Sequence, residues 1–200
     1  MERARASAAW PGALGWLPIV AGDKEAVAQK IRINRAPVLT LWAAVVAERL
    51  GFDRAEALTL GRAVAGLNAY AKGTSLGLFH PAPEKVRQQR KKAGAPQELQ
   101  VALLGRAVPV VRTPEGVRAL SKDRPISAPI VARYLEGKFG EALPAARAAM
   151  AKLARSRTPS ALAAEAYPLY ERFRPSIPAG VRGWGAKGVL DVAKIAALAR

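Results

Sequence analysis

The sequence predicts a mainly α-helical fold, a helical bundle with a small β-hairpin. Half of the 200 residues are hydrophobic, which is enough to bury a sizeable core. Proline, glycine and capping residues that begin and end helices recur along most of the chain. One stretch, 106–121, instead combines branched residues with a turn sequence, which is typical of a hairpin.

The first two predicted helices form a pair joined by a tight turn. Pro37 suits a first helical turn and Gly51 suits a C-terminal cap. Asp53 and Glu56 match the acidic version of a capping box, which opens a second helix that ends at Gly73. Both helices are strongly apolar, and this favours a buried helical hairpin.

The same pair resembles a helix-turn-helix over residues 46–60. Apolar or small residues occupy the positions that this motif requires: Val46, Ala47, Leu50, Gly51, Phe52, Ala57 and Leu60. The resemblance implies DNA binding by the second helix. That helix, however, offers acidic and apolar residues where a reading helix presents polar and basic ones, so the buried hairpin is the favoured interpretation.

The segment after His80 is the densest basic cluster of the chain. Its cations surround a single acid, Glu84, and are Lys85, Arg87, Arg90, Lys91 and Lys92. We interpret them as nucleic-acid contacts on a short helix or arm, with a solvated connector as the alternative. The chain then divides into an N-terminal arm (1–30), a hairpin scaffold (31–80), a basic connector (81–100) and a region (101–200) that either stands apart or forms one domain with 31–80.

A short helix is predicted from Glu98 to Leu104, followed by the hairpin. Val108, Val110 and Val111 favour a strand, "TPEG" is a good turn, and "VRAL" returns as the second strand. Pro109 indicates an edge strand. Basic residues flank the hairpin, of which Arg112 and Arg118 are candidate backbone contacts, solvated surface arginines being the alternative.

The C-terminal part returns to helix. Ser127 can cap a helix that stops at Gly140, a further helix follows, and Thr158 can cap a third helix with a kink at Pro168.

The stretch "GVRGWGAKG", residues 180–188, is a candidate phosphate-binding loop. A glycine-rich turn that leads into a helix presents backbone N–H groups to an anion. It resembles the Gly-x-Gly turn of a helix-hairpin-helix, which grips a DNA backbone without reading sequence. The candidate contacts are Arg182, Gly183, Trp184, Gly185 and Lys187. The alternative is a tight turn with a buried tryptophan.

Residues suited to catalysis or metal binding are scarce. The chain has no cysteine and one histidine, His80, so the usual zinc sites and Cys-His pairs cannot form. No phosphate-loop or dinucleotide fingerprint is present. We therefore expect no catalytic residues, no metal and no cofactor. No apolar run reaches about 18 residues, so no membrane span is expected. We predict a cytoplasmic protein, nucleoid-associated if it is bacterial.

Charge gives the strongest indication of function. The formal net charge is +17, and both halves of the chain carry part of it. This favours nucleic-acid binding, with DNA preferred over RNA, mainly through phosphates and with low sequence specificity. A homodimer is expected only by analogy with helix-rich DNA binders, because the sequence itself does not set the oligomeric state.

Two other classes of function stay open. The first is an enzyme acting on nucleic acid or a phosphorylated substrate, with Tyr134, Tyr167 or Tyr170 and scattered acids. The second is an interaction module for an acidic protein or an anionic membrane. The stretches "LTLWAAVVAERLGFD" and "GWGAKG" also resemble a group of uncharacterised basic bacterial proteins, which implies no activity.

Overall fold

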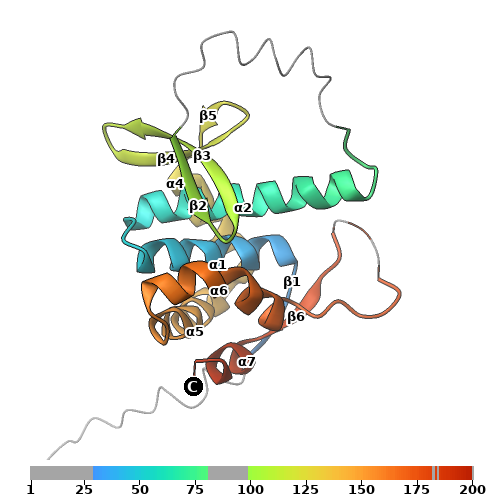
Figure 1. The fold of residues 1–200 in the computed structure, drawn as a ribbon. Coiled ribbons are helices and arrows are strands. Elements are labelled where there is room, and N and C mark those ends of the chain that lie inside the picture. Colours follow the sequence, from blue (N-terminus) through green and yellow to red (C-terminus); the bar gives the residue numbers. More distant parts are fainter. Residues whose placement is uncertain (1–28, 81–98, 182, 184, 200) are drawn as a thin grey trace, which may run out of the picture.

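The computed structural model describes residues 29–80, 99–181, 183 and 185–199, and Figure 1 shows their arrangement. Its elements follow in chain order: β1 (Lys30–Ile33), α1 (Arg35–Arg49), α2 (Arg54–Ser75), β2 (Leu99–Leu103), β3 (Arg106–Thr113), β4 (Gly116–Ser121), β5 (Arg124–Pro125), α4 (Ala128–Phe139), α5 (Leu143–Arg155), α6 (Pro159–Phe173), β6 (Gly188–Asp191) and α7 (Val192–Ala197). The fold is mainly α, as the sequence predicts, with two antiparallel sheets.

The predicted helical hairpin is confirmed and lies at the centre of the core. α1 and α2 run alongside one another, and every residue of α1 from Pro37 to Ala47 is buried. The two backbones approach closely at Gly61, where an added Cβ would lie 2.9 Å from the backbone N of Ala44. The first part of α2, where the resemblance to a helix-turn-helix lies, is also buried, since residues 57–61 are all buried. This stretch therefore does not present the exposed face that a helix-turn-helix uses to read bases.

The predicted capping box at the start of α2 is confirmed. The Asp53 carboxylate accepts a hydrogen bond from the Glu56 backbone N at 2.8 Å, and the Glu56 side chain accepts one from the Asp53 backbone N at 3.2 Å. Gly51 has a φ of 103°, a left-handed conformation that glycine adopts without strain. These local signals place the turn where the sequence predicts it.

A four-stranded sheet in the order β2-β3-β4-β5 packs against α2. The predicted turn and both hairpin strands are confirmed as β3 and β4, but the expectation of one small hairpin is wrong. The predicted helix at 98–104 is also wrong, because residues 99–103 form β2, which pairs antiparallel with β3. Leu104 and Gly105, at φ 48° and 69°, form the tight turn between these strands.

The prediction that Pro109 marks an edge strand is wrong as well. β3 lies between β2 and β4, and Pro109 faces Gln100 of β2. Pairing of β3 with β4 begins only at the next residue, where Val110 faces Ala119. The missing N–H of the proline therefore breaks no bond to β4.

Helices α4, α5 and α6 complete the core around the hairpin. In Figure 1 the sheet lies above α2, whereas α5 and α6 lie below α1. Trp42 of α1 is fully buried and donates a 2.7 Å hydrogen bond to the carbonyl oxygen of Ala166 in α6. The buried side chains of all these elements form one continuous hydrophobic cluster. Within the described ranges, no helix combines the length and apolar character needed to cross a membrane.

The chain after the glycine loop differs from the predicted turn-to-helix arrangement. Residues 188–191 form β6, which pairs antiparallel with β1. The helix that follows, α7, spans six residues, and the Asp191 carboxylate caps it by accepting from the backbone N atoms of Ala193 and Lys194. A strand therefore separates the glycine loop from its helix, unlike in a helix-hairpin-helix.

Candidate functional site

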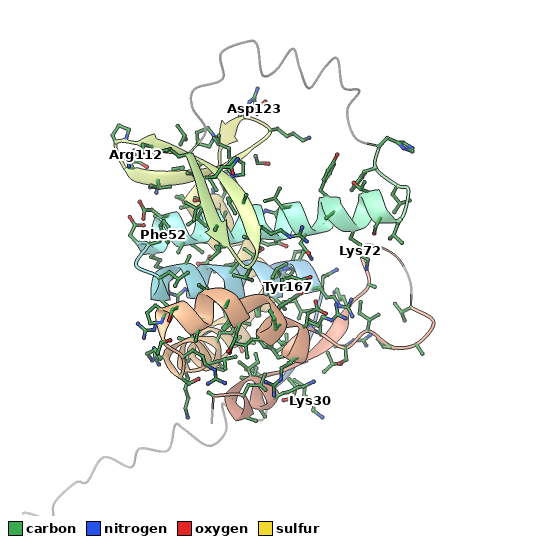
Figure 2. All side chains as sticks on the ribbon, in the orientation of Figure 1. Lys30, Phe52, Lys72, Arg112, Asp123 and Tyr167 are labelled. Carbon is green, nitrogen blue, oxygen red and sulfur yellow. The ribbon has the colours of Figure 1, made fainter. Side chains whose placement is uncertain are left out.

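A cavity of about 900 Å³ lies where α1 begins and α2 approaches its end. We call this end of the α1–α2 hairpin the open end, and the connection at residues 50–53 the turn end. Figure 2 labels Lys72 and Tyr167, two residues of the cavity wall. The polar lining comes from several elements and comprises Asn34, Arg35, Asn68, Lys72, Ser75, Arg106, Tyr134, Lys138, Tyr167, Tyr170, Glu171 and Arg174.

Positive charge dominates this lining. Five cations face one carboxylate, that of Glu171, and they are Arg35, Lys72, Arg106, Lys138 and Arg174. Arg174 pairs with Glu171 at 2.8 Å. Within the described ranges the other four form no ion pair with a carboxylate, so the cavity carries an excess of positive charge that favours an anionic ligand.

The positive end of α1 adds to this charge. Its N-cap residue, Asn34, makes no side-chain capping bond, and the first turn of the helix contains no acid. Asn34 instead donates through Nδ2 to the carbonyl oxygen of Gly185 at 3.1 Å. Backbone N–H groups at the start of a 15-residue helix are left without an internal partner, and they carry part of the helix dipole.

Three tyrosines supply the aromatic part of the cavity. Tyr170 is buried and donates a 3.2 Å hydrogen bond to the carbonyl oxygen of Arg35. Burial raises the pKa of Tyr134, Tyr167 and Tyr170 above the ordinary tyrosine value. Their hydroxyls therefore stay protonated at neutral pH and act as neutral donors.

Asn68 connects two of these side chains. Its Oδ1 atom accepts hydrogen bonds from Nη2 of Arg106 and from the hydroxyl of Tyr167, both at 3.3 Å. Arg62 covers one ring of the wall, since its guanidinium carbon lies 4.7 Å from the centre of the Tyr134 ring. These contacts hold both tyrosines in place.

The structure brings part of the predicted glycine loop to this cavity. Gly183 lines it, and Gly185 contacts Asn34 at the start of α1. Lys187 is exposed on the same loop. The helix start beside the loop is therefore that of α1, about 150 residues earlier, rather than the helix that follows it in sequence.

The two candidate arginines of the hairpin differ from one another. Arg112 is exposed on β3, far from Lys72 in Figure 2. Arg118 is 8% exposed, its Nη2 atom lies 3.5 Å from the Glu115 carboxylate, and its Nη1 atom donates to the carbonyl oxygen of Val117. Burial and pairing therefore limit the access of Arg118 to a phosphate.

Seven predicted contacts lie outside the described residues: Lys85, Arg87, Arg90, Lys91, Lys92, Arg182 and Trp184. Conversely, the five cavity cations are absent from the contacts predicted from sequence. They come from segments separated by up to about 140 residues, and no spacing rule links them. The described residues contain no group of three histidine or acidic side chains that could hold a metal ion.

No protein-family model, curated protein or solved structure matches this chain. Function is therefore inferred from the site itself.

Proposed function

We propose that this protein binds nucleic acid, chiefly through the phosphate backbone and with low sequence specificity. The observation that carries the proposal is the open-end cavity, where five cations face one carboxylate beside the start of α1. Phosphate oxygens are the groups that arginine, lysine and helix N-termini bind best in nucleic acids.

The surface outside the cavity supports the same proposal. Exposed cations occur on the sheet, on α4, on α6 and on the glycine loop, and they include Arg112, Lys122, Arg124, Arg133, Arg172 and Lys187. With a net charge of +17, a long polyanion can contact several of them together. The burial of residues 57–61 in the first part of α2 supports low specificity, because these side chains are not available for base contacts.

An enzyme is the less supported alternative. The cavity does bring together Tyr134, Tyr167 and Tyr170, but among its described lining residues Glu171 is the sole carboxylate. Acid–base or two-metal chemistry on a phosphate ester needs more than one suitably placed group.

The test is fluorescence anisotropy of the pure protein with labelled duplex DNA, single-stranded DNA and RNA over a range of salt concentrations. We expect the logarithm of the affinity to fall linearly with the logarithm of the salt concentration. Polyglutamate and vesicles containing anionic lipid serve as controls. Absence of nucleic-acid binding at low salt would contradict the proposal, and binding to a control polyanion alone would favour an interaction module.

A further inference from the structure

We propose that the open-end cavity holds a single nucleotide, with its phosphate on the cations and its base at the tyrosines. The nucleotide either belongs to a bound strand, in which case the inference rests on the proposed function, or is a free nucleotide. Both present the same chemistry to the cavity, and comparing free nucleotides with oligonucleotides distinguishes them.

The size and the lining of the cavity suit a ligand with one anionic and one planar part. Its volume of about 900 Å³ is within the range of small-molecule sites, roughly 300–1,000 Å³. Its wall is also partly apolar, with Leu39, Leu76, Leu78 and Ile177. Inorganic phosphate would leave this apolar part empty, and an apolar ligand would leave the cations without a partner.

Three cations from three different helices are available to the phosphate. Arg35 begins α1, Lys72 lies in α2 and Lys138 lies in α4. Arg35 donates through Nε to the carbonyl oxygen of Pro175 at 3.3 Å, which orients the guanidinium. No described residue pairs with its two terminal nitrogens, which leaves them for a ligand. Arginine forks and lysine ammonium groups are complementary to phosphate oxygens.

Asn68 provides a polar group for the base. Because its Oδ1 atom accepts from both Arg106 and Tyr167, the orientation of the amide is fixed and Nδ2 is its donor. Among the described residues, no acceptor pairs with that Nδ2 atom. A ring nitrogen or carbonyl oxygen of a base can accept from it while the base contacts the half-buried ring of Tyr167.

The experiment is isothermal titration calorimetry of the full chain with nucleoside monophosphates, the corresponding nucleosides, inorganic phosphate and short single-stranded oligonucleotides. The cavity variant is Lys72→Ala with Lys138→Ala. The matched control is Lys152→Ala with Lys194→Ala, which removes two exposed lysines from α5 and α7 that do not line the cavity. A second pair, Tyr167→Phe and Tyr167→Ala, keeps or removes the ring, and thermal unfolding checks that each variant is folded.

We expect a nucleotide to bind more tightly than its nucleoside or inorganic phosphate. The cavity variant should weaken it about ten-fold or more, since two charge-assisted contacts are lost, and the control should not. Tyr167→Phe keeps the ring but loses the hydrogen bond to Asn68, so it should bind more tightly than Tyr167→Ala. If only oligonucleotides bind, and the lysine and Tyr167 variants weaken their binding in the same way, the nucleotide is part of a strand.

Two results would overturn the inference. One is inorganic phosphate binding as tightly as the nucleotides, because the base would then have no site. The other is oligonucleotide binding that the cavity and Tyr167 variants leave unchanged, with no binding of free nucleotides. In that second case the proposed function would stand, because binding to the strand would persist elsewhere on the surface.

Discussion

The two ends of the α1–α2 hairpin differ in how their polar groups are used. At the turn end, Glu48 pairs with Arg147 at 2.7 Å, and Glu56 both completes the capping box and accepts from the backbone N of Val117 at 2.7 Å. At the open end, Asn34 forms no capping bond and Lys72 has no carboxylate partner among the described residues. Satisfied groups stabilise a fold, whereas charges left without partners are available to a ligand.

The largest effect should come from the close contact between α1 and α2 at Gly61. Replacing Gly61 with alanine places a methyl group against the carbonyl oxygen of Thr40 and within 2.9 Å of the backbone N of Ala44, so α1 and α2 must separate. We expect a loss of about 3 kcal/mol in the free energy of unfolding. Gly66→Ala in the same helix meets no atom within 4 Å and should be neutral or stabilising by about 0.5–1 kcal/mol. Urea unfolding measures the free energy of unfolding of both variants. Equal values would mean that the two helices do not need a glycine at position 61.

A smaller loss should follow from changing the turn end. Glu56→Ala removes the capping-box acceptor and leaves the backbone N of Val117 without its partner, for an expected loss of about 2 kcal/mol. Glu56→Gln retains an acceptor oxygen and should lose less. Nucleic-acid affinity measured at a temperature where Glu56→Ala is folded should equal that of the wild type. Weaker binding by this variant would show that the turn end also contributes to ligand binding.

The next effect concerns Tyr170, because burial raises the pKa of its hydroxyl. Above about pH 10 the unfolded chain releases the tyrosine proton while the folded protein retains it, so stability should fall as pH rises. Tyr170→Phe loses the bond to the carbonyl oxygen of Arg35, and at neutral pH it should be less stable by about 1 kcal/mol. The difference between wild type and variant should narrow above pH 10 in thermal unfolding. A difference that is constant with pH would mean that the hydroxyl titrates alike in both states.

Local signals predict much of this fold from the sequence. Asp53 with Glu56 sets the start of α2, Thr158 accepts from the backbone N of Ala161 at the start of α6, and Gly140 ends α4 with a φ of 56°. Each of these signals acts over a few residues and needs no information from the rest of the chain. This is why the helices of the core were predictable.

The parts that were not predictable depend on pairing between distant segments. Residues 99–103 have a composition compatible with helix or strand, and their pairing with β3 decides the outcome. β6 forms because β1, about 160 residues earlier, pairs with it. The cavity is the extreme case, since packing between distant segments places Arg35, Lys72 and Lys138 around one cavity and no local spacing encodes this.

The central claim, that the open end binds phosphate while the turn end maintains the fold, is tested most directly by the salt dependence of nucleic-acid affinity. Anisotropy would compare the wild type with Lys72→Ala plus Lys138→Ala and with Lys152→Ala plus Lys194→Ala. For the cavity variant we predict weaker binding to all sequences and a slope of log affinity against log salt smaller in magnitude by about 1–2, with stability changed by less than about 0.5 kcal/mol. An unchanged slope in the cavity variant, or an equal change in both variants, would contradict the claim.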